Sequence, residues 1–238
     1  KGLCYKLKTY KLPEAAAAAK GRPLVNLLPL EQGETIKSFA DLKGKTIRQI
    51  RELGVSHISE DRNTYGAALV SSVKDNILSD RYYKKEYNNG ILMNDKKINE
   101  MTDELIKEFL VKCDDRDDQV KMLSGGNVQK VLVGREIAAA PKVLMTAYPV
   151  RGLDINSSYA IYNILNRQKE NGVGILFVGE DLDVMIALCD KIMVLCHGKV
   201  MGVVHAHKTT KEELGLMMTG ALDLTYKYED KPAGFAKD

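Results

Sequence analysis

The chain has 238 residues, of which 45% are hydrophobic and 28% charged, so it can form one large domain or two small ones with a real core. Its 35 basic and 32 acidic residues leave a formal net charge of +3, which is too balanced to indicate binding to nucleic acid or an anionic membrane. No apolar stretch approaches the roughly 18 residues of a membrane-spanning helix. Because the chain begins at Lys1 without a methionine, we expect a fragment or an incomplete reading frame.

The first 36 residues predict a short β segment. Polar and apolar side chains alternate over 3–10, as in a half-buried strand, and 23–34 follows as a second strand closing in a glycine turn. The alanine run at 15–19 would favour a helix, but Pro13 and Gly21 bound it tightly, so we expect a loop or a single turn.

From about residue 43 helices and strands alternate, which predicts a mostly parallel sheet covered by helices. Helices are expected at 46–53, 71–78, 94–113, 155–170, 182–188 and 210–220, and a loop entering a helix at 123–140. Strands are expected at 54–59, 142–147, 173–178, 190–196 and 198–205, the last two as a hairpin. Ser71 or Ser72 and Asn94 are candidate N-caps, and Gly220 is a candidate C-cap. The polar tail at 221–238 is expected to fray.

The stretch "LSGG", Leu123 to Gly126, could bind an anion. Ser124 is placed to cap a helix whose first turn holds two glycines, and the free N–H groups of a helix start attract negative charge. Glycine also lets a phosphate approach the backbone closely. Taken alone, Ser-Gly-Gly before a helix is a weak signal, and a capped helix after a loop explains most such stretches.

The order of motifs along 43–220 resembles the nucleotide-binding domain of ABC transporters. "LSGGNVQK" resembles the family signature, "VLMTAYP" the Walker B strand, "RGLD" the D-loop, and "ILFVGEDLD" the strand that ends at the H-loop. Together with "GVSHISEDR" and "SVKDNI", they resemble most the second, degenerate ATPase half of tandem subunits that drive import of simple sugars or nucleosides. The resemblance implies an α/β, P-loop NTPase-like fold with a helical subdomain at about 70–123.

The P-loop of that family is missing from this sequence. Gly44, Lys45 and Thr46 resemble the end of the pattern G-x-x-x-x-G-K-[ST], but Phe39 stands where its first glycine belongs. We therefore interpret these residues as a decoy and expect the true P-loop to lie upstream of residue 43.

The acids of the resembled site are also replaced. Ala147 stands in place of the Asp that holds Mg²⁺, Tyr148 in place of the catalytic Glu, and Glu180 in place of the H-loop His. Glu60 takes the place of the Q-loop Gln. Neither Ala nor Tyr can hold Mg²⁺ as a carboxylate does or act as a base near pH 7. We therefore expect no catalytic residue, no resident metal and no ATP hydrolysis by this chain alone.

The resemblance implies that two ATPase halves face each other head to tail, and that each half donates its signature to the other's nucleotide. This chain would contribute Ser124, Gly125, Gly126, Gln129 and Asp154 in trans, with ATP and Mg²⁺ held at the partner's site. The implied partners are a second ABC ATPase half, membrane permease subunits and, indirectly, an extracellular substrate-binding protein. The implied location is peripheral, on the cytoplasmic face of the cell membrane.

Residues 1–36 resemble one repeat of the C-terminal domain of the DNA gyrase and topoisomerase IV A subunit. Lysines and arginine on this segment would suit phosphate contacts: Lys6, Lys8, Lys11, Lys20 and Arg22. One blade cannot wrap DNA alone, and nucleic acid is not the expected partner. Two alternatives to the transporter hypothesis remain open: a DNA-binding module, or a chimeric gene product without function that is joined between Ile36 and Lys43.

Overall fold

The computed structural model describes residues 42–89 and 92–224, which form two compact units at 42–179 and 180–224. The predicted β segment at 1–36 and most of the predicted tail lie outside the described residues. Each unit is described by itself. In the described residues, no helix is long and apolar enough to cross a membrane.

A parallel sheet organises the first unit, as the alternation of elements predicted. Its strands are β1 (Val55–Ile58), β4 (Val143–Ala147) and β5 (Gly174–Val178), in the order β1-β4-β5. In the register, Leu144 lies between Ser56 of β1 and Ile175 of β5. β4 is therefore the central strand of the described sheet.

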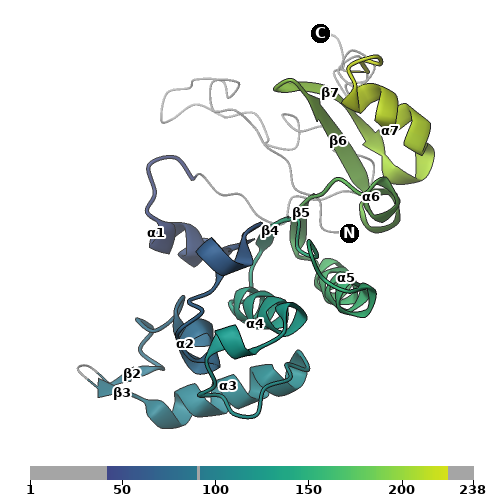
Figure 1. The fold of residues 1–238 in the computed structure, drawn as a ribbon. Helices are drawn as coiled ribbons and strands as arrows, with labels where there is room; N and C mark the ends of the chain where they lie inside the picture. Colours follow the sequence, from purple (N-terminus) through teal and green to yellow (C-terminus); the bar gives the residue numbers. More distant parts are fainter. Residues whose placement is uncertain (1–41, 90–91, 225–238) are drawn as a thin grey trace, which may run out of the picture. The chain divides into compact units, whose positions relative to one another are not determined.

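Two long helices, α4 (Gly125–Ala138) and α5 (Ile155–Glu170), pack with the sheet in the main core (Figure 1). Ile58 and Leu144 are almost fully buried on the covered face, because every second residue of a strand points the same way. On the opposite face, Leu176 and Val178 remain 43% and 44% exposed. In the described part of the first unit, this face of β5 therefore carries exposed apolar side chains.

The helical part of this unit contains α1 (Ile47–Glu52), α2 (Val73–Leu78) and α3 (Asp95–Glu108). Smaller elements, none of them predicted, are η3 (Arg62–Gly66), β2 (Asn88–Asn89), β3 (Leu92–Met93) and η4 (Val120–Met122). The predicted caps are confirmed: Ser72 accepts from Asp75 N–H, and Asn94 accepts from Lys97 N–H.

Helix α3 ends five residues earlier than the 94–113 range predicted. Phe109 is its C-cap, and Leu110 follows with a positive φ of 52°. Ile98, Leu105 and Phe109 form an apolar stripe and are buried. The Phe109 ring lies against Gly134, where an added Cβ would come within 2.9 Å of it, so α3 and α4 approach closely.

A buried charge network joins α1, the end of α2 and α4. The guanidinium of Arg51 bonds Glu136 at 2.9 Å and Asp80 at 3.1 Å, and Arg135 Nε bonds Glu136 at 3.1 Å. Arg81 pairs with Asp80 and also donates to the carbonyl of Arg135. Burial opposes the charge of Arg51, but Glu136 and Asp80 together raise the pKa of its guanidinium. The Glu136 side chain has no exposed surface, so this network replaces all of its hydration.

The second unit contains α6 (Leu182–Leu188), β6 (Lys191–Cys196), β7 (Lys199–His205), η5 (Ala206–Lys208) and α7 (Lys211–Met218). β6 and β7 form the predicted hairpin, which turns at His197 and Gly198, both with positive φ. It forms a two-stranded sheet of its own. The C-cap of α7 is Thr219, one residue before the predicted Gly220, which follows with φ 76° and donates its N–H to Met217 O.

Replacing Glu136 tests the buried network. Glu136→Ala leaves two guanidinium groups without their shared carboxylate, and we expect the free energy of unfolding to fall by about 3–5 kcal/mol. Urea denaturation followed by circular dichroism measures the change. The control is Asp103→Asn, which breaks the exposed pair with Arg116 and should cost less than about 1 kcal/mol. Equal effects of the two substitutions would contradict the network's importance.

Candidate functional site

Ser124 lies at the start of α4, as predicted, but it does not cap the helix with its side chain. Its hydroxyl makes no hydrogen bond to the N–H groups of the first turn and instead accepts from Asn127 Nδ2 at 2.9 Å. This corrects the predicted capping role. Ser124 is exposed, and its hydroxyl does not occupy the N–H groups of the first turn. These N–H groups therefore keep their attraction for an anion.

Asp154 ties the loop at 151–154 to the turn at 124–126. It is the N-cap of α5, and its carboxylate accepts from Ser157 N–H at 2.9 Å and from Ser157 Oγ at 2.6 Å. The side-chain hydrogen bond from Ser157, followed by the backbone one, lowers the pKa of Asp154. Ser157 in turn packs on Gly126, where a Cβ would lie 3.0 Å from the Ser157 Cβ and closer still to its hydroxyl. Only glycine fits at position 126 without a shift.

Glu60 and Arg62, in the loop after β1, both contact Arg151. Glu60 forms an ion pair with Arg151, and Arg62 Nη1 donates to the carbonyl of Arg151 at 2.6 Å. The other end of the guanidinium, Nη2, lies 3.1 Å from where a Cβ on Gly125 would stand. Three segments far apart in the sequence therefore meet: 60–62, 124–126 and 151–157.

Arg62 and Ser157 were not predicted from the sequence. Ser157 could have been found, because an Asp three residues before a Ser at a helix start is a common capping arrangement. Arg62 carried no comparable local signal, since its partners lie 63 and 89 residues further along the chain.

The end of β4 does not fit Mg²⁺. Ala147 lies opposite Val178 in the sheet. Tyr148 has a positive φ of 48° and donates its N–H to the Val178 carbonyl at 2.9 Å. Neither side chain is a carboxylate, and the Arg151 guanidinium lies 5.8 Å from the Tyr148 ring. In the described ranges, no group of three or more His, Cys, Asp or Glu is placed to hold a metal.

The structure also shows where Gln129, Thr46 and Glu180 lie. Gln129 is 2% exposed, so it has almost no surface with which to meet a nucleotide, and the expected contact is not supported. Thr46 caps α1, accepting from Gln49 N–H while Gln49 accepts from Thr46 N–H. The hydroxyl of Thr46 is thus engaged in a capping box at a six-residue helix, which agrees with interpreting 44–46 as a decoy. Glu180 begins the second unit.

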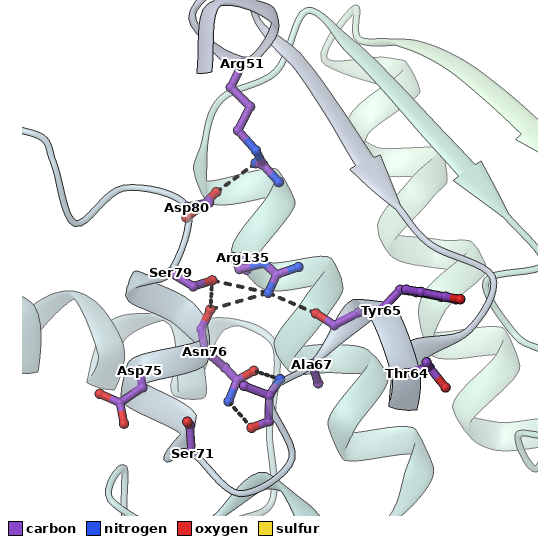
Figure 2. A pocket seen from close by; sticks show the side chains of 12 residues that line it. Arg51, Thr64, Tyr65, Ala67, Ser71, Asp75, Asn76, Ser79, Asp80 and Arg135 are labelled. Carbon is purple, nitrogen blue, oxygen red and sulfur yellow. Dashed lines mark hydrogen bonds and ion pairs between the residues drawn. The ribbon is translucent and has the colours of Figure 1, made fainter. Parts of the chain in front are cut away.

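A partly open groove of about 590 Å³ lies beside η3 and α2 (Figure 2). Arg135 crosses it, donating to the carbonyl of Gly66 at 3.2 Å and to Ser79 Oγ at 3.4 Å. Asn76 holds the η3–α2 connection by bonding both backbone groups of Ala68. Tyr65, in the same turn as Arg62, lines the groove and is 81% exposed.

Comparison with known proteins gives consistent relatives. No protein-family model matches the chain. The guanosine import ATP-binding protein NupO of Bacillus subtilis is 32% identical over 198 residues, which are 83% of this chain and 39% of NupO. The ribose import ATP-binding protein RbsA of Lactococcus lactis subsp. cremoris is 34% identical over 172 residues, 72% of this chain and 35% of RbsA. The chain thus spans less than half the length of these relatives.

Solved structures agree on the fold. The ADP conformation of MJ1267, an ATP-binding cassette of an ABC transporter, has a TM-score of 0.55 at 20% identity, over 80% of this chain and 74% of that one. The cassette MJ0796 bound to ADP and Pi has a TM-score of 0.56 at 18% identity, over 68% and 66%. The chain therefore has the α/β fold of an ABC-transporter ATP-binding cassette, and its relatives are ATP-binding proteins of nucleoside and sugar importers.

Proposed function

We propose that this chain is the degenerate ATPase half of an importer of nucleosides or simple sugars, and that it donates its signature to a nucleotide held by a second half. The donor surface is Ser124, Gly125, Gly126 and Asp154. One observation carries the proposal: Ser124 and Asp154 are exposed, Gly125 is partly exposed and Gly126 packs beneath them on Ser157, whereas the end of β4 offers no carboxylate. Random decay of the gene would not be expected to preserve the donor surface while removing the carboxylates at the end of β4.

The chemistry of the donor surface suits a phosphate. The start of α4 presents backbone N–H groups with the positive end of the helix dipole, and Ser124 adds an exposed hydroxyl. Gly125 has no side chain to obstruct an approaching oxygen. ATP, with Mg²⁺ held by the partner's residues, would supply the negative charge. This chain would bind and orient that charge and exclude water from one side of it.

Asp154 would serve the donor surface indirectly. Its carboxylate is occupied by Ser157, so it acts by holding α5 against Gly126 and not by taking a proton. The two loops then move together. A displacement of the signature in the paired halves would therefore also displace the D-loop, through the packing of Ser157 on Gly126.

Permease subunits are the proposed membrane partner, and the groove beside η3 and α2 is their proposed docking surface. It offers the exposed ring of Tyr65, while the guanidinium groups of Arg51 and Arg135 in its lining are already paired with Glu136. A permease helix would pack on Tyr65. Since η3 begins at Arg62, a shift of η3 on docking would move Arg62, which contacts the loops beside the signature. An extracellular substrate-binding protein would act through the permease, and the chain would be peripheral at the cytoplasmic face.

The two competing hypotheses have direct tests. The DNA-binding hypothesis depends on Lys6, Lys8, Lys11, Lys20 and Arg22, which lie outside the described residues. A salt-dependent DNA mobility shift at physiological ionic strength would favour it. The chimeric hypothesis fails if one unbroken sequencing read of the source DNA spans codons 20 to 60.

Ser124→Arg tests the donor role. A long cation at this exposed position fills the space that the partner's phosphate needs, so ATP hydrolysis by the assembled pair should be abolished. Phosphate release measures the effect. Asn171→Arg is the control, because it adds the same side chain at the far end of α5 and should leave the rate unchanged. Full activity of the Ser124 variant would refute donation.

The isolated chain should neither hydrolyse ATP nor bind Mg-ATP tightly, because the end of β4 has no metal-holding carboxylate. Calorimetric titration with Mg-ATP and a phosphate-release assay provide the measurements. Tight binding by the chain alone would contradict the assignment of Ala147 and Tyr148.

Gly126→Ala should force the signature away from the D-loop, because the new Cβ meets Ser157. Overpacking of this kind costs about 1–3 kcal/mol of folding stability and should lower hydrolysis by the assembled pair. Ser157→Gly in the same chain should relieve the clash and restore part of the stability. The matched control is Gly215→Ala in α7, where a Cβ meets open space. If both alanine variants behave alike in thermal unfolding, the contact does not matter.

A further inference from the structure

Arg62 is held firmly at its backbone. It is the first residue of η3, and Asp61 caps this turn by accepting from Asn63 N–H and Thr64 N–H, both at 3.0 Å. The hydrogen bonds with Thr64, the side-chain one first, lower the pKa of the Asp61 carboxyl. The side chain of Arg62 therefore starts from a fixed point.

Its guanidinium lies between the signature and the D-loop. Nη1 donates to the Arg151 carbonyl at 2.6 Å, and Nη2 lies 3.1 Å and 3.6 Å from where Cβ atoms on Gly125 and Gly152 would stand. Both glycines leave room for it, and Gly152 also has φ 68°. Nε is buried, and in the described part of the chain it has no hydrogen-bond partner. The group is held by its fit against two backbones and by one strong hydrogen bond.

This arrangement has a cost that folding alone does not explain. A cation beside the first turn of α4 faces the positive end of the helix dipole. A buried N–H without an acceptor adds a further penalty. An apolar side chain would pack the same gap without either cost, so the arginine is better accounted for by what it does to the neighbouring loops.

We propose that Arg62 is a positioning residue for the donor surface: its planar guanidinium sets the distance between Gly125 and the D-loop carbonyl of Arg151. This rests on the proposed function. Lysine cannot replace it, because a single ammonium group does not span two backbones as a planar fork does. The positioning acts before any nucleotide arrives, so it can be measured in the chain by itself.

The first test is hydrogen exchange on this chain without ligand. Arg62→Gln should speed exchange of the hydrogen-bonded backbone amides of Asn127, Arg151 and Leu153 by about tenfold, the equivalent of one lost hydrogen bond to a charged group. Amides of the hairpin β6–β7 should be unchanged. Arg116→Gln, which removes an exposed arginine from its pair with Asp103, is the matched control and should leave 124–127 unaffected. Unchanged exchange in the Arg62 variant would overturn the proposal.

The second test is ATP hydrolysis by the assembled pair. Arg62→Gln and Arg62→Lys should each raise the KM for ATP by about tenfold and change kcat less, because a displaced donor surface meets the partner's nucleotide more weakly. A loss of folded protein would instead lower kcat alone, which would count against positioning. Parent-like kinetics of Arg62→Lys would also overturn the proposal. If Ser124→Arg leaves hydrolysis intact, the donor role itself fails, so the two failures are distinguishable.

Discussion

Glu136 places a carboxylate where water does not reach, and the position of α4 depends on the guanidinium groups that meet it. Arg51 and Arg135 bind this one side chain, and Arg81 binds the backbone of Arg135 next to it. At the other end of the same helix, Gly126 packs on Ser157. A helix fixed at both ends can present its first turn at a defined place, which a phosphate-binding surface requires.

Local chemistry explains what the sequence predicted well. Hydrophobic runs located β1, β4 and β5, and capping residues such as Ser72, Asn94 and Gly220 marked helix ends, since these signals act over a few residues. The end of α3 was placed too late because Phe109 continues the apolar stripe after the helix has stopped. Ser124 has the residue type of a cap, yet its hydroxyl accepts a hydrogen bond from the side chain of Asn127 and not from the backbone.

The candidate site was predictable in its motifs and not in its contacts. The signature and the D-loop could be recognised as stretches of sequence, but their meeting through Gly126 and Ser157 depends on how two helices pack. Arg62 depends on three loops at once, and no spacing along the chain encodes such a meeting. Gln129 is only 2% exposed although it lies inside the stretch that resembles the signature, so burial is another property that the motif alone does not predict.

The apolar side chains that β5 exposes in the described part of the first unit affect how the protein behaves in solution. Parallel sheets are normally covered on both faces, yet Leu176 and Val178 are exposed on β5, which is an edge strand of the described sheet. Unpaired strand edges with apolar side chains associate with one another. The isolated chain should therefore tend to self-associate along β5 as its concentration rises.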